Sequence, residues 1–222
     1  MNRVFHLDFP EFPHLGLITD HCMVSGTAKA DLFRYIILYL YGGVYADLDS
    51  APNAMTNSTI QDEDDGFFVV EQYHMLSQYF MAVSPRHPLM FYAIQHAIHN
   101  VMGQQDTGRQ NVAFVTGPHA LHAGYRDFRL DHNGDKVDPA GAGYKPVWNG
   151  TFYGTDDRSI RVVGIGENEN EYVWRSLVKQ RFKLQEYKQQ GMEHFSDFNK
   201  KNKATGQSCF QAIQTALKAS GT

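Results

Sequence analysis

Residues 35–52 read "YIILYLYGGVYADLDSAP", and this stretch decides the fold. An apolar run ends in two glycines at residues 42–43, and a short segment with strand character, residues 44–48, follows at once. Asp47 and Asp49 come where the chain leaves that segment. Carboxylates at a buried strand end cost free energy unless something positive lies against them. The stretch therefore predicts that the two aspartates face a positive charge.

The residues before this stretch predict a helix over residues 27–41, "TAKADLFRYIILYLY". Apolar side chains recur there at helical spacing, and Ser25 or Thr27 can cap the first turn. The two glycines supply the helix stop. In the segment that follows, side chains alternate between the two sides of the strand, so Asp47 and Asp49 are expected on the same side.

Two charged residues, Asp31 and Arg34, interrupt the apolar character of the predicted helix. They are three residues apart, so they are neighbours on one helix face. One interpretation is a surface ion pair worth a few tenths of a kcal/mol. The other is a site, because the same helix leads through the glycines directly into D-x-D. A D-x-D pair at a strand end suits a hard divalent cation such as Mg²⁺ or Mn²⁺.

Composition predicts one soluble globular domain over residues 1–222, with 42% hydrophobic and 20% charged residues. The net charge is −4 and no basic block is present, which argues against nucleic acid as the main partner. No window reaches 18 apolar residues, so no membrane span is expected. Localisation stays open between cytoplasmic and lumenal, depending on flanking sequence.

Cys22 and Cys209 are too few and too far apart for a disulfide framework or a thiolate zinc site. A single long-range disulfide between them is left open. The sequence contains N-x-S/T sequons at Asn57 and Asn149. Residues 1–12 lack the features of a signal peptide, so the sequons alone say little.

The remaining pattern mixes strands with helices and shows neither a repeat nor a linker, which predicts an α/β domain. Loops are expected at 61–66 and 131–146, strands at 4–9, 67–72, 78–84, 111–118 and 160–166, and helices at 89–102, 119–125, 171–187 and 209–219.

Residues 28–52, "AKADLFRYIILYLYGGVYADLDSAP", closely resemble the sugar-binding region of the D-x-D glycosyltransferases of family 32. That family includes the initiating α-1,6-mannosyltransferase group, and the clostridial glucosylating toxins share the same helix, Gly-Gly and D-x-D arrangement. Weaker similarity continues at residues 78–90, 114–121 and 193–201. The resemblance implies a GT-A-like single domain with a mixed central sheet flanked by helices. Only about 26 residues precede the helix, so either the N-terminal nucleotide-binding half is abbreviated or the chain is a fragment of a longer protein.

The same resemblance implies roles for individual residues. Asp31 and Arg34 would bind hydroxyls of the donor sugar, and Asp47 would contact the donor and the water shell of a metal. Asp49 would ligate Mn²⁺ or Mg²⁺ directly, and Asp47 and Asp49 would together be the catalytic pair. His194 is a further candidate for the metal or the diphosphate, with an ordinary surface histidine as the alternative.

Candidate substrate contacts complete the set. Tyr35 belongs to the matched Arg-Tyr pair, and Gln78 could reach the donor pocket together with Tyr79. Thr116 and His119 flank a T-G-P turn and could line the acceptor side, although this turn could equally be only structural.

The resulting hypothesis is a metal-dependent, retaining glycosyltransferase. It would move a hexose from a UDP- or GDP-sugar to a glycan or glycoprotein hydroxyl. One alternative is a haloacid-dehalogenase-type phosphatase, which also places D-x-D after an apolar strand, and another is a non-catalytic carbohydrate-binding relative. A calcium loop at residues 131–135 is disfavoured, because Lys136 occupies the position that requires glycine.

Overall fold

The computed structural model describes residues 2–7, 9–48, 50–52, 59–70, 75–108, 110–130, 149–163, 178–180, 189, 191 and 204–220. Its helices are α1 (Asn2–Phe5), α2 (Leu15–His21), α3 (Gly26–Tyr41), α4 (Pro88–Met102), α5 (Val112–Val115), α6 (Pro118–Leu130), the 3₁₀ turn η1 (Thr155–Asp157) and α10 (Cys209–Ser220). Its strands are β1 (Gly43–Ala46), β2 (Ser50–Pro52), β3 (Gly66–Val70), β4 (Leu76–Val83), β5 (Gly150–Tyr153), β6 (Ser159–Val163) and β7 (Val178–Gln180).

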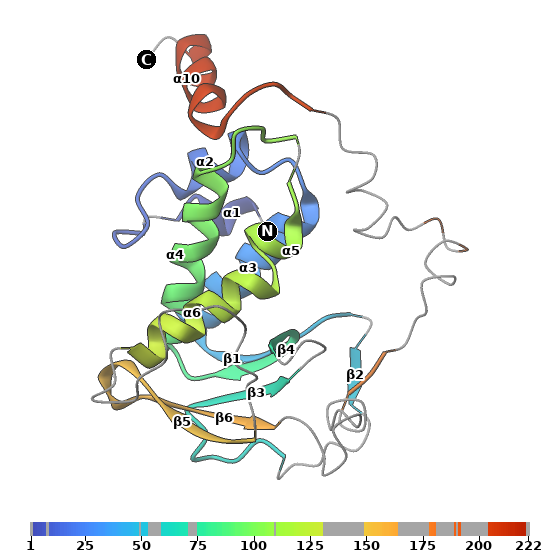
Figure 1. The fold of residues 1–222 in the computed structure, drawn as a ribbon, viewed down its shortest axis with the longest axis vertical. Coiled ribbons are helices and arrows are strands. Elements are labelled where there is room, and N and C mark those ends of the chain that lie inside the picture. The colour runs from blue at the N-terminus through green and yellow to red at the C-terminus, as the bar shows by residue number, and fades with distance from the viewer. Residues whose placement is uncertain are drawn as a thin grey trace.

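A five-stranded sheet with the order β1-β4-β3-β6-β5 forms the centre of the domain. β3 and β6 pair in parallel, while the other neighbours are antiparallel. Helices α3, α4 and α6 lie together on one side of this sheet (Figure 1). The predicted α/β class with a mixed central sheet is therefore confirmed. A separate antiparallel pair joins β2 to β7.

The neighbouring strands β3 and β4 supply most of the buried core residues of the sheet. Side chains alternate between its faces, so each strand contributes to two hydrophobic clusters. One cluster packs against the helices and includes Phe68, Val70, Met81 and Val83. The other lies on the opposite face and consists of Phe67, Val69, Phe80 and Ala82.

Helix α3 begins and ends as its sequence predicts. The Ser25 side chain accepts a hydrogen bond of 3.3 Å from the backbone N–H of Ala28, which caps the first turn. At the other end Gly42 has a φ of 63°, and a Cβ there would lie 2.7 Å from the ring of Pro85. Glycine at position 42 therefore both stops the helix and lets the chain pass Pro85.

Three sequence predictions of secondary structure are wrong. Residues 2–5 are helical rather than the start of a strand over 4–9, because one turn of helix buries Phe5 against the core. Residues 112–115 form α5 instead of a strand, and the carbonyl groups of Thr116 and Gly117 that follow accept hydrogen bonds from the buried Tyr35 hydroxyl. Within the helix predicted at 171–187, residues 178–180 form β7, because they pair with β2. The predicted loop at 131–146 lies outside the described residues.

The loop at 61–66 is also more than a solvated turn. Arg158 Nε and Nη2 reach the Asp65 carboxylate at 2.5 and 2.7 Å, and Arg161 Nε reaches Asp64 at 2.6 Å. These ion pairs tie the loop to β6. Although burial opposes it, hydrogen bonds from Arg158 and Ser84 lower the pKa of Asp65 to about 2.

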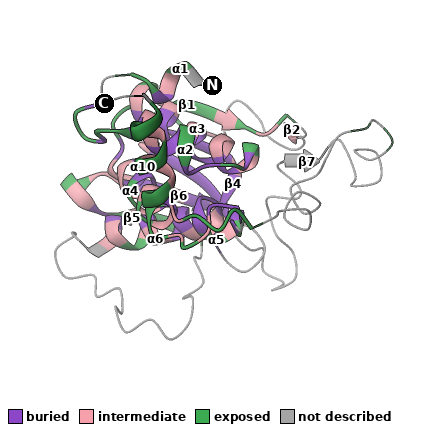
Figure 2. Ribbon diagram, turned by 90° about the horizontal axis from the view of Figure 1, so that it is seen from above, coloured by how far each residue is buried: buried purple, intermediate pink, exposed green. Residues whose placement is uncertain are grey.

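The C-terminal helix is covalently attached to the N-terminal part of the domain. A disulfide joins Cys22, at the end of α2, to Cys209, at the start of α10. Beside it, the Asp106 carboxylate accepts backbone hydrogen bonds of 2.9 Å from Gly108 and Thr205. Much of α10 is nevertheless on the surface (Figure 2). In the described parts of the chain, no helix combines the length and hydropathy needed to cross a bilayer.

Helix α6 packs tightly on α4 at Gly124, and we expect Gly124→Ala to lower the free energy of unfolding by roughly 1–3 kcal/mol. A Cβ there would lie 2.6 Å from the backbone nitrogen of Ala93, so the helices would have to separate. Gly103→Ala is the matched control, because Gly103 has a right-handed φ of −72° and a Cβ contact no closer than 3.4 Å. Urea unfolding of both variants tests this, and equal losses would contradict the close packing of α4 on α6.

Candidate active site

The helix pair Asp31 and Arg34 is buried, not exposed. Arg34 Nη2 lies 3.3 Å from Asp31 Oδ1, and their side chains are only 8% and 4% exposed. A surface ion pair is therefore excluded. Taking both charges out of water costs free energy. A gain in stability alone therefore does not explain why this ion pair is buried.

Arg34 also joins α3 to the sheet. Its Nη1 donates 2.9 Å to the backbone carbonyl of Gln78 on β4 and lies 3.3 Å from Asp47 Oδ1. The guanidinium sits over the Tyr45 ring, 4.8 Å from its centroid. Burial alone would lower the pKa of Arg34, but the carboxylates of Asp31 and Asp47 raise it above its usual range. The side chain is thus a fixed cation between two acidic groups.

The D-x-D motif begins just after β1, not within it. The Asp47 backbone N–H donates 2.9 Å to the Tyr79 carbonyl, which continues the pairing of β1 with β4 for one more residue. The Tyr45 hydroxyl donates 2.8 Å to Asp47 Oδ1. Burial raises the pKa of Tyr45, so its hydroxyl keeps the proton that it donates. Asp47 is consequently oriented from two sides, by Tyr45 and by Arg34.

A buried hydrogen-bond network lies behind Asp31. The Tyr35 hydroxyl donates 3.0 Å to the Thr116 carbonyl and accepts 2.6 Å from Gln78 Nε2. Thr116 Oγ1 in turn donates 2.9 Å to Asp31 Oδ2. Tyr35 and Thr116 are both fully buried. The network fixes the Asp31 carboxylate from the side of the core.

Burial also changes the acidity of Asp31. It raises the pKa of the carboxyl group to about 7, although Arg34 and the Thr116 hydroxyl act in the opposite direction. Asp31 therefore changes its charge near neutral pH while it lies beside a permanent cation.

Asp31, Arg34 and Asp47 open onto one pocket of about 260 Å³. Its other lining residues come from α3, β4, α5 and the start of α6 with the residue before it: Thr27, Gln78, Tyr79, Val112, Ala113, Gly117 and Pro118. Tyr35 and Thr116 lie behind this lining. His119 stacks on Phe114, with ring centroids 3.9 Å apart and an angle of 20° between the planes. Burial lowers the pKa of His119.

Comparison with known families finds a match over residues 13–65, described as a glycosyltransferase sugar-binding region containing a DXD motif. These residues are therefore similar to that sugar-binding region. The matched part holds Asp31, Arg34 and Asp47 but ends before Gln78 and Thr116. The similarity thus concerns the part of the chain that contains the helix, the two glycines and the D-x-D motif.

Comparison with solved structures finds similarity to a protein titled "PaToxG Glycosyltransferase", with 19% sequence identity and a TM-score of 0.37. The similarity covers 44% of this chain and 33% of that chain, so this chain spans about a third of that relative's length. Comparison with curated proteins found no match.

The predicted metal ligands Asp49 and His194 lie outside the described residues. Among the residues that are described, no group of three or more His, Cys, Asp or Glu side chains forms a metal-binding cluster. Asp47 supplies a hard carboxylate at the edge of the pocket, which is the donor type that Mn²⁺ and Mg²⁺ prefer. Of the two carboxylates of the D-x-D motif, only Asp47 lies among the described residues, and its oxygen atoms suit such an ion.

The strand before the motif differs from the one that the phosphatase alternative needs. β1 is an edge strand, and Gly43, Val44 and Ala46 on it are exposed. The phosphatase pattern requires a buried apolar strand directly before D-x-D. β1 is exposed, so the D-x-D motif of this chain does not follow such a strand.

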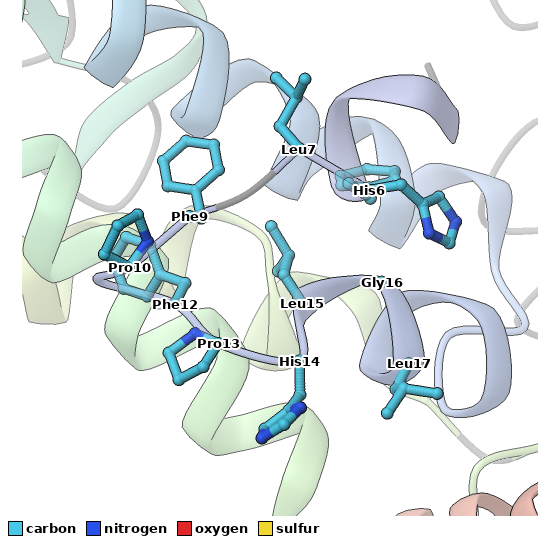
Figure 3. A pocket seen from close by; sticks show the side chains of 11 residues that line it. His6, Leu7, Phe9, Pro10, Phe12, Pro13, His14, Leu15, Gly16 and Leu17 are labelled. Atoms are coloured by element: carbon cyan, nitrogen blue, oxygen red, sulfur yellow. The ribbon is translucent and has the colours of Figure 1, made fainter.

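Another pocket, of about 430 Å³, lies in the N-terminal segment that precedes α3. It is shown in Figure 3 and is lined by Phe5, His6, Leu7, Phe9, Pro10, Phe12, Pro13, His14, Leu15, Gly16 and Leu17. None of these residues lines the pocket at Asp31. Residues near the start of the chain thus line a pocket that is separate from the one at Asp31.

Sequence reasoning gave no role to Tyr45, although this residue contacts both Arg34 and Asp47. Its position two residues before Asp47 was the available signal, because alternate residues of a strand share one side. Val112 and Ala113 were missed for a different reason, since the pocket receives them only through the helical turn of α5.

Proposed function

We propose that this chain is a metal-dependent, retaining GT-A-type glycosyltransferase. It moves a hexose from a UDP- or GDP-sugar to a hydroxyl of a glycan or glycoprotein. The family match over residues 13–65 supports glycosyl transfer, and the buried polar site supports a sugar as the group that is bound.

The single observation that carries this proposal is Arg34, held between Asp31 and Asp47 at the pocket. A sugar presents hydroxyls that both donate and accept, so it matches a cationic donor next to carboxylate acceptors. Among the described residues, nothing accepts a hydrogen bond from the buried Nε of Arg34. A buried donor without an acceptor lowers the stability of the fold. The same donor, next to two carboxylates, can bind the hydroxyl groups of a sugar.

The other residues have separate parts in the proposal. Gln78, with Tyr79, lines the donor side, while Tyr35 and Thr116 are positioning residues that hold Asp31 through the buried network. His119 lies toward the acceptor side beside Phe114. The departing phosphate of the donor takes the proton of the acceptor hydroxyl on the same face of the sugar, and we assign no nucleophile of the chain.

Asp47 and Asp49 would hold Mn²⁺ or Mg²⁺, with His194 as a further candidate ligand. When bound, the cation neutralises the diphosphate and assists its departure. Tyr45 and Arg34 contribute by fixing the Asp47 carboxylate in place before the donor arrives.

The direct test of the metal role is Asp49→Ala. Mn²⁺-dependent binding of a nucleotide sugar is expected to be lost in calorimetric titrations, and donor hydrolysis is expected to stop. Asp62→Ala is the control, because Asp62 is an exposed acidic residue of the 61–66 loop. Unchanged turnover in Asp49→Ala would overturn the metal role. Donor binding with no hydrolysis or transfer in the unmodified protein would favour the non-catalytic carbohydrate-binding relative.

Donor binding is also expected to depend on pH through Asp31. The pKa of Asp31 is about 7, so acidification protonates the group and removes its charge and one hydroxyl acceptor. If binding requires the ionised form, the apparent Kd for the sugar nucleotide rises roughly tenfold from pH 8 to pH 6.

The nucleoside diphosphate without its sugar is the control ligand for this titration, because it does not reach Asp31 in the proposal. Asp31→Asn should bind the sugar nucleotide weakly at every pH in this range. A constant ratio of the two Kd values from pH 8 to pH 6 would contradict a sugar contact by Asp31.

A further inference from the structure

Both cysteines of the chain are used in one buried disulfide. The sequence contains 2 cysteines, and the bond joins Cys22 to Cys209 across a separation of 187 residues. They are 0% and 1% exposed, and the bond attaches α10 to the end of α2. Disulfides of this structural kind form in oxidising compartments and are rare where thiols are kept reduced. The structure thus points to maturation in an oxidising environment.

In an oxidising secretory compartment the sequon Asn149-Gly150-Thr151 is a candidate site for N-linked glycosylation. All three residues are exposed, and the last two begin β5. β5 is the terminal strand in the order β1-β4-β3-β6-β5, so one of its edges is unpaired in the described sheet. An N-x-S/T sequence on the surface of a protein that passes through the secretory pathway is an acceptor for N-linked glycans. The sequon is therefore presented where a large glycan can be attached.

We propose that Asn149 carries an N-linked glycan, attached in the compartment in which the Cys22–Cys209 disulfide forms. The donor class is a lipid-linked oligosaccharide diphosphate, and the catalyst is an oligosaccharyltransferase of the cell that makes the protein. A bond forms between the Asn149 amide nitrogen and C1 of the first sugar, while the bond from C1 to the phosphate breaks. The lipid diphosphate leaves, and the amide proton passes to a base of the host enzyme.

The place of Asn149 in the fold allows this modification without blocking the candidate active site. Asp47 follows β1, and Asn149 precedes β5, at the two opposite edges of the five-stranded sheet. Four interstrand spacings of about 4.8 Å separate the edges by roughly 19 Å. A glycan at β5 also covers an open sheet edge, which otherwise can pair with other chains.

The test is peptide mapping of the native protein from its natural source, kept non-reduced. We expect the Cys22 and Cys209 peptides to be linked until reduction, and the unmodified Asn149 peptide to be missing. After treatment with peptide N-glycosidase the peptide should appear with aspartate at position 149. An unmodified Asn149 peptide in untreated protein, or free thiols at Cys22 and Cys209, would overturn the proposal.

Variants secreted from a eukaryotic cell separate this site from the sequon at Asn57. Asn149→Gln and Thr151→Ala should both lose the glycan at residue 149, whereas Thr151→Ser should keep it. Asn57→Gln should leave the Asn149 glycopeptide unchanged. A glycopeptide at position 149 that survives Thr151→Ala would also contradict the proposal. Peptide mapping reads the glycan directly, so this test does not depend on the proposed transferase activity. If that activity is present, Asn149→Gln should bind donor like the wild-type protein, because β5 is remote from the pocket.

Discussion

Arg34→Ala is expected to lose donor-sugar binding and to lower the free energy of unfolding by about 3–5 kcal/mol. The guanidinium bridges Asp31, Asp47 and the Gln78 carbonyl, and the Arg34 side chain is almost inaccessible to water. Its removal leaves the Asp31 carboxylate buried without its cation. Uptake of a proton by Asp31, whose pKa is already about 7, limits the loss of stability but not the loss of binding.

The measurements are urea unfolding and calorimetric titration with a nucleotide sugar and with its nucleoside diphosphate. Arg34→Ala should weaken binding of the sugar nucleotide more than binding of the diphosphate. Arg34→Lys keeps the charge without the forked geometry, so it should fold better than Arg34→Ala and still bind sugar poorly.

Arg86→Ala is the matched control, because Arg86 pairs with Glu11 at 2.7 Å on the surface with its side chain 53% exposed. That change should cost about 0–1 kcal/mol and leave donor binding intact. Equal losses of affinity for both ligands in Arg34→Ala would count against a sugar contact.

The second large effect is expected at the disulfide. The double variant Cys22→Ala/Cys209→Ala should lose about 2–5 kcal/mol of stability, toward the upper end, because the bond closes a very long loop of the unfolded chain. For a protein of this size the Tm falls by roughly 2–4 °C for each kcal/mol, which predicts a drop of roughly 5–20 °C.

Thermal unfolding of the unmodified protein, with and without a reductant, provides the matched comparison. Reduction should reproduce the variant's Tm and should not change the variant itself. If α10 were held in place mainly by the hydrogen bonds of the preceding residues Thr205 and Gly206 to Asp106, the variant and the wild-type protein would unfold at the same temperature, which would contradict this prediction.

Local sequence determined the part of the site that is contiguous in the chain. Ser25 begins α3, Gly42 ends it, and the helix places Asp31 and Arg34 on neighbouring positions of one face. These features depend on interactions within a few residues, such as a cap, a positive φ and the helical repeat. They were therefore predictable from residues 25–52, and the family match covers the same region.

Only the tertiary structure decided what these residues do for one another. The hydroxyl that binds Asp31 belongs to Thr116, 85 residues away, and the carbonyl that binds Arg34 belongs to Gln78, 44 residues away. The strand predicted at 111–118 became α5 because packing on α3, α4 and α6 outweighs the strand preference of a short β-branched run. Burial of the ion pair, the pKa of Asp31 and the Cys22–Cys209 bond all follow from such distant contacts. Local pattern cannot specify them, since each depends on which elements pack together and how much water that packing removes.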